Sequence, residues 1–279
     1  MPPIPRSTAA SILTVLGDAV FEIIDAAGDL ALFTLLTFKG LIRKRVYPGT
    51  LLPNLYSIGV RSVPVIAITG TFIGMVLAVQ SYDQFHNLGL ATQLGSIVNE
   101  TIITELGPVL AATMLAGRIG SAMAAELATM RINEQIDALS CLGVEPHDYL
   151  VGPRFIGCVT LIPLLTALAD FMGVMGGGLV CIRIYHVPAH HYWEHARAFV
   201  RPWDMFVSLF KPIFFGSAIA IISCYQGFKS PAGSEGVGRA STDAFVRSFI
   251  AILVLDLFLN MFLNSFHETL WPATGSRMF

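Results

Sequence analysis

One polar stretch lies between two apolar runs that are each long enough to cross a membrane, and it constrains the fold of the whole chain. Its sequence is Glu126-Leu-Ala-Thr-Met-Arg131-Ile-Asn-Glu134-Gln135-Ile-Asp137-Ala-Leu139. Charged residues are 13% of the chain, yet four of them fall in these fourteen positions. At about 100° per residue, the polar residues share one side of a helix and the apolar residues the other. The pattern predicts a short amphipathic helix at the bilayer surface.

Met130 is the one apolar residue on the charged side of this predicted helix. A flexible apolar side chain in that position suits a partner's pocket, and Glu126, Arg131, Glu134 and Asp137 would surround it. The alternative is a solvated helix that carries a methionine with no partner. The pattern alone leaves both interpretations open.

Composition places the chain in a membrane. It is 54% hydrophobic with 25 glycines, and its mean hydropathy is +0.67, which is typical of several spanning helices. A net charge of −2 argues against nucleic-acid binding. The four cysteines are far apart and form no CxxC pair, so we expect neither a disulfide framework nor a zinc site; they are Cys141, Cys158, Cys181 and Cys224.

Five apolar segments predict an all-α membrane protein with five spans, at residues 62–82, 96–125, 155–182, 212–228 and 248–266. In the first span, Gly70 and Gly74 have the GxxxG spacing that allows close helix contact, in the subunit core or at a dimer seam. We expect the same role for Gly117 and Gly120. A leucine should be tolerated better at Gly173, in a glycine-rich run, than at Gly74.

The first 58 residues predict a separate N-terminal amphipathic region, followed by a membrane domain at 59–268 and a short tail at 269–279. Residues 11–38 are expected to form a helix that lies in the interface or along the bundle edge, not a span. Its acids form one stripe that faces water or a basic partner; they are Asp18, Glu22, Asp25 and Asp29.

The basic residues predict that the N-terminus is cytoplasmic and the C-terminus lies outside. The cluster at 39–45 would stay inside, and the loop at 83–99 has no lysine or arginine. Arg183, Arg197 and Arg201 disagree, because this orientation puts them outside.

Besides Glu100 near the start of the second span, three acids lie deeper within predicted spans, where each costs about 2.5–3.5 kcal/mol at a helix centre. Glu105 precedes Gly107-Pro108, a pair that should kink the helix and free backbone carbonyls. Asp170 and Asp256 are alone in long apolar runs. Each acid could serve packing alone, but the helix break favours a functional role for Glu105.

Two other motifs invite chemistry. His186, His190, His191 and His195 contain i, i+4 pairs that can chelate zinc, but Pro188 interrupts them and no acid is placed as in an HExxH helix. An interfacial helix is the better interpretation, although the sequence does not settle whether the cluster binds metal. The glycine-rich segment 233–239 lacks the Lys-Ser/Thr ending of a phosphate loop. We therefore predict a flexible cytoplasmic loop that includes Gly236, Gly238 and Arg239, and no nucleotide site.

The chain resembles the MlaE/YrbE permeases, the membrane subunits of ABC transporters that act with MCE proteins in lipid trafficking. The resemblance covers roughly residues 59–266 and includes the polar stretch at 126–139. The other matching segments are Gly70-Thr-Phe-Ile-Gly74-Met75-Val, Glu105-Leu-Gly107-Pro108-Val, Ala116-Gly117-Arg118-x-Gly120-Ser121-Ala, Pro153-Arg154 and Gly236-Val237-Gly238-Arg239-Ala240.

This resemblance implies a transport subunit of the bacterial inner membrane, not an enzyme, with a fold similar to ABCG-type exporters. The expected assembly is a homodimer with two cytoplasmic ATPases that bind ATP and Mg, a periplasmic ring of MCE subunits, and a small STAS-type accessory subunit as a further candidate. The cytoplasmic helix would couple permease to ATPase through Glu126, Met130, Arg131, Glu134 and Asp137. The cargo would be phospholipid, in support of outer-membrane lipid asymmetry.

Candidates for the lipid cavity are Thr104, Glu105, Pro108 and Gly74. Some relatives have arginine before the acid that matches Glu105, whereas this chain has Thr104, so a lipid-phosphate contact does not carry over. Two other hypotheses remain: an ion- or proton-coupled carrier that uses Glu105, Asp170 and Asp256, and a histidine metalloenzyme. Neither transport direction nor lipid class follows from the sequence.

Overall fold

The structure, a computed structural model, describes residues 8–43, 48–87 and 93–270, and these ranges contain helices but no strand. Five stretches are long and apolar enough to span a membrane, which confirms the predicted all-α membrane fold; they are Gly49–Phe85, Leu94–Ile132, His147–Arg183, Pro202–Phe228 and Ser234–Thr269. Each extends beyond its predicted range, because a helix continues past its apolar part. The segment 271–279 of the predicted tail lies outside the described residues.

The helices run in chain order with three short π-helical segments between them. They are α1 (Thr8–Arg43), α2 (Pro48–Ile58), α3 (Val63–Asn87), α4 (Leu94–Thr101), η3 (Ile102–Leu106), α5 (Gly107–Leu115), η4 (Ala116–Gly120), α6 (Ser121–Ile132), α7 (Gln135–Cys141), η5 (His147–Val151), α8 (Gly152–Arg183), α9 (Ala189–Phe199), α10 (Pro202–Phe228) and α11 (Ser234–Leu270).

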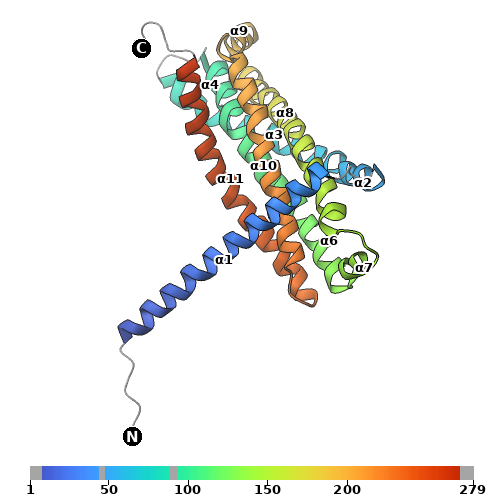
Figure 1. Ribbon diagram of the computed structural model, residues 1–279. Helices are drawn as coiled ribbons and strands as arrows, with labels where there is room; N and C mark the ends of the chain where they lie inside the picture. Colours follow the sequence, from blue (N-terminus) through green and yellow to red (C-terminus); the bar gives the residue numbers. More distant parts are fainter. Residues whose placement is uncertain (1–7, 44–47, 88–92, 271–279) are drawn as a thin grey trace.

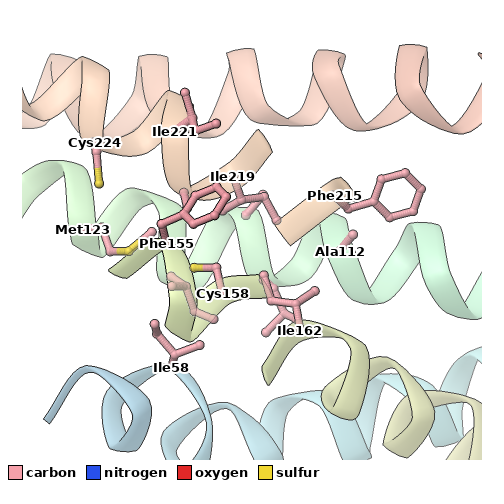
Figure 2. Packing of buried hydrophobic residues seen from close by; sticks show 14 of the residues in the cluster. Ile58, Ala112, Met123, Phe155, Cys158, Ile162, Phe215, Ile219, Ile221 and Cys224 are labelled. Carbon is pink, nitrogen blue, oxygen red and sulfur yellow. The ribbon is translucent and has the colours of Figure 1, made fainter. Parts of the chain in front are cut away.

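The spans form one bundle in which α8 packs on α3 and α10, and α10 packs on α6 and α11. One end of the bundle carries α4, α9 and the end of α11, and the other carries α6, α7 and the start of α11 (Figure 1). Buried side chains of α2, α5, α6, α8 and α10 fill the centre (Figure 2). A smaller apolar cluster at the α9 end surrounds the fully buried Tyr192.

Helix α1 runs obliquely away from the bundle (Figure 1) and is not one of the five apolar spans. Its later part is attached: Phe33 is buried against the rings of His147, Tyr225 and Phe228. Asp29 of the acidic stripe pairs with Lys229. At least one acid of the stripe therefore meets a basic partner, and this partner belongs to the same chain.

The tightest helix contact joins α3 to α8 through glycines. A Cβ on Gly70 would lie 2.7 Å from the Ala169 carbonyl oxygen, and one on Gly74 would overlap the carbonyl of Gly173. The contact lies within one subunit. One expectation was therefore wrong, because Gly74 cannot line a lipid cavity. A Cβ on Gly173 would lie 3.1 Å from the Ile102 side chain, so position 173 is tight but less obstructed than position 74.

We predict that Gly74→Ala lowers the melting temperature of the purified protein by at least several degrees, because the new methyl group must push two helix backbones apart. Gly238→Ala is the matched control, since a Cβ on Gly238 of α11 would meet no atom within 4 Å. The control should be neutral or stabilising by up to about 1 kcal/mol. Equal melting temperatures for both variants would contradict this close contact.

Candidate functional site

A lysine lies completely buried inside the fourth span, and the sequence analysis missed it. The predicted span began at residue 212, but α10 begins at Pro202, where Asp204 accepts a hydrogen bond from the Arg201 backbone N–H at 3.0 Å. Lys211 is therefore inside the membrane-spanning helix, with no exposed surface. The signal was present: proline at the first helical position and an acid two residues later mark a helix start.

Lys211 binds the backbone where Pro108 interrupts the second span. In an α-helix the N–H of residue 108 would bond to the carbonyl of residue 104, but proline has no N–H to donate. The Lys211 ammonium donates to the Thr104 carbonyl oxygen instead, at 3.0 Å. The predicted break takes the form of a π-helical segment, η3, just before Gly107, a type of distortion that is frequent at functional sites.

Lys211 also joins two acids of different spans. Its Nζ lies 3.6 Å from Glu105 Oε2 and 3.4 Å from Asp256 Oδ1. Asn260, one turn after Asp256, donates to Glu105 Oε2 at 3.0 Å and to Asp256 Oδ2 at 3.2 Å. We call these four residues the polar cluster. The single positive charge of Lys211 thus neutralises one of the two carboxylate charges, and the Asn260 amide donates hydrogen bonds to both carboxylates.

Only part of the polar cluster is covered by this subunit. The Glu105 side chain is 49% exposed, whereas Asp256 is 17% exposed and Lys211 is fully buried. Glu105 lies eleven residues into its span, about 16 Å along the helix from the α4 end. A carboxylate that faced hydrocarbon there would be costly. The exposed side of Glu105 therefore requires a polar neighbour or a water-filled space.

Asp170 belongs to a different environment. It is buried, accepts a hydrogen bond from Ser208, and lies so close to Gly107 that any side chain at position 107 would overlap its carboxyl group. An apolar cavity of about 260 Å³ lies beside Asp170 and Ser208. The three acids of the ion-carrier hypothesis are thus not gathered at one site: Lys211 joins Glu105 and Asp256, while Ser208 holds Asp170.

We predict that Lys211→Met destabilises the protein by about 3 kcal/mol, the low end for a broken buried ion pair, because Glu105 is half-exposed. Thermal unfolding in detergent measures the change. Adding Asp256→Asn to the variant should restore part of the loss, since it removes one uncompensated carboxylate. Lys39→Met, an exposed lysine of α1, is the control. A Lys211→Met protein as stable as that control would show that the lysine does not hold the acids.

The polar stretch at 126–139 forms two helices, not the single helix expected. Helix α6 ends at Ile132, and α7 begins at Gln135 after Glu134, which has a left-handed backbone conformation (φ +56°). The predicted polar face is thereby divided. Arg131 is exposed, but it donates to the Phe228 carbonyl, so its side chain is engaged within the chain.

Two other residues of the predicted coupling face also have partners within the chain. Glu126 forms an ion pair of 3.0 Å with the buried Arg154 of α8, and Met130 is half-buried against the main core. Glu134 and Asp137 remain exposed. Leu142, just after α7, is an exposed apolar side chain at this end, with 77% of its surface accessible. Met130 was therefore the wrong candidate for an exposed knob.

The remaining candidates also have defined positions. Residues 234–239 begin helix α11, so the prediction of a flexible loop was wrong there; Gly236 is buried against the Pro231 carbonyl. Gly120 approaches Ser223 of α10, whereas Gly117 makes only ordinary contact with Phe245. Among the described residues, no three His, Cys, Asp or Glu side chains lie together as a metal site would need.

Comparisons with known proteins agree on one family. The family model described as Permease MlaE matches residues 51–262. A probable ABC transporter permease protein of Rickettsia conorii is 40% identical over 244 residues, which cover 88% of this chain and 94% of the relative. The intermembrane phospholipid transport system permease protein MlaE of Haemophilus influenzae is 33% identical, covering 88% and 95%. The chloroplastic protein TRIGALACTOSYLDIACYLGLYCEROL 1 of Arabidopsis thaliana is 34% identical, covering 77% and 62%.

Proposed function

This chain belongs to the MlaE permease family, and on this premise we propose that it is the membrane subunit of an ABC transporter that moves phospholipid. The observation that carries the proposal is the half-exposed Glu105 inside the bundle. A second copy of the chain, placed against this side, would enclose the polar cluster in a shared cavity. A lipid headgroup fits such a cavity, because the surrounding helix surfaces are apolar and can accept the acyl chains.

The polar cluster offers acceptors to a ligand, not free cations. The Lys211 ammonium faces the Thr104 carbonyl and the two carboxylates, and Thr104 itself carries no charge. The Glu105 side chain stays half-exposed. We therefore expect contact with the donor end of a headgroup, such as the ammonium of phosphatidylethanolamine, and not with its phosphate.

Helix α7 is the proposed contact with a separate ATPase subunit that binds ATP and Mg. Leu142 and the exposed acids Glu134 and Asp137 share this end of the bundle. In the proposed orientation α7 lies in the cytoplasm of a bacterium, and the α4 and α9 end meets an MCE ring in the periplasm. The STAS-type subunit stays a further candidate partner.

Lipid transfer by the reconstituted complex tests the cargo path. We expect Glu105→Gln to reduce ATP-dependent phospholipid transfer at least about tenfold, at matched assembly, because only the charge is lost while the volume is kept. Glu100→Gln, which changes an exposed acid of the same span, should transfer lipid like the wild type. Unchanged transfer with Glu105→Gln would reduce Glu105 to a packing role, and transfer without ATP would favour the carrier hypothesis.

Copurification tests the ATPase contact. We predict that Leu142→Asp lowers the amount of ATPase subunit recovered with the tagged chain, because it replaces an exposed apolar contact by a charge. Met130→Ala should instead lower thermal stability, by about 1–2 kcal/mol for a half-buried methionine, and keep ATPase recovery. If Met130→Ala lowered ATPase recovery while Leu142→Asp did not, Met130 and not Leu142 would be the docking residue.

A further inference from the structure

A polar cavity of about 520 Å³ lies between α10 and α11 at the α7 end of the bundle. Three cationic side chains line it: Lys229, Arg239 and Arg247. Asp243 is the one acid that lines it. Even when Asp29 of α1 neutralises Lys229, the cavity keeps a net positive charge. It is thus suited to an anion.

The cations converge because of helix geometry. Arg239, Asp243 and Arg247 are spaced i, i+4, i+8 and share one face of α11. Lys229 follows the end of α10 and lies 5.0 Å above the Tyr225 ring. The hydrogen bond to Asp29 raises the pKa of Lys229, so its ammonium stays charged.

The two arginines differ in how far they are engaged. The Arg247 guanidinium faces the Gln226 amide, with 3.2 Å from Nε and 2.8 Å from Nη1 to the amide oxygen in the orientation that satisfies both groups. Arg247 is thereby held toward the cavity. Arg239 is exposed and forms no hydrogen bond or ion pair with any residue that the structure describes. It is the donor left for a ligand.

The surroundings place this cavity at a bilayer surface. Phe245 and Phe249 continue along α11 with more than a third of their surface exposed, as lipid-facing residues do. Helix α1 meets the cavity rim through Asp29 and exposes Phe21 and Ile24 farther along, which suits a helix in the headgroup region. The cations thus border both hydrocarbon and water.

We propose that this cavity binds the phosphate of an anionic phospholipid from the leaflet at the α7 end, through Arg239, Arg247 and Lys229. Basic pockets between spanning helices are a recurring form of headgroup site. The site is separate from the polar cluster, because Asp256 lies nine residues beyond Arg247, the nearer of the two arginines, about 14 Å along α11. A bound headgroup would also stabilise the attachment of α1, since Lys229 contacts both.

Native mass spectrometry of the full chain, with its copurified subunits, tests the proposal. Mixed micelles contain equal amounts of phosphatidylglycerol and phosphatidylcholine. We expect the wild type to retain phosphatidylglycerol selectively. Arg239→Gln/Arg247→Gln should reduce that selectivity about thirtyfold, which corresponds to about 1 kcal/mol for each of the two arginines near an anionic surface. Arg239→Lys/Arg247→Lys should keep most of it, and Arg183→Gln, an exposed arginine at the other end, should keep all of it.

Two further measurements keep the result interpretable. Arg239→Gln alone removes a side chain with no described partner, so it should retain the wild-type melting temperature while it loses selectivity. Inorganic phosphate at millimolar concentration should not reproduce the thermal stabilisation that phosphatidylglycerol gives. Three results would each overturn the lipid site. The wild type could retain both lipids equally, the double glutamine variant could keep the wild-type selectivity, or free phosphate could stabilise the protein as fully as phosphatidylglycerol does. Loss of ATPase subunit without any change in lipid selectivity would assign the cavity to a protein contact instead.

Discussion

The missing N–H of Pro108 is the constraint on which the membrane-embedded part of this protein depends. Its absence leaves the Thr104 carbonyl without a helical donor, and a buried lysine from another span supplies one. A lysine in that position must be neutralised, and Glu105 and Asp256 do so from two further helices. One backbone defect thereby joins the second, fourth and fifth spans at one point.

Ion pairs between helices also hold other parts of the structure together. Two further cations meet an acid from a different helix: Arg154 meets Glu126, and Lys229 meets Asp29. These pairs attach α6 to α8 and α1 to α10. Helix α6 is therefore fixed to the bundle, while α7 extends from it after the left-handed Glu134. A displacement of α7 would therefore reach the bundle through α6.

A continuous chain of helices links α6 to the polar cluster. The span Leu94–Ile132 contains two π-helical segments: η4, which lies between α6 and Glu105, and η3, which contains Glu105. Such segments can shift helix register at small cost, because their hydrogen bonds are already irregular. The span can thus pass a displacement at α6 to the helix turn that holds Glu105, without crossing a loop.

The sequence by itself determined the class of structure: apolar runs fixed five spans, and local rules located the helix break at Gly107-Pro108 and the close approach at Gly70 and Gly74. Those features depend on neighbouring residues alone.

Only the tertiary structure decided which side chains meet. It showed that Lys211 is the partner of Glu105, that Arg131 bonds to the Phe228 carbonyl while Met130 is half-buried, and that Leu142 is exposed. Residues as far as 200 positions apart are joined, as Asp29 and Lys229 are, and no periodicity along the chain encodes which helices will pack together.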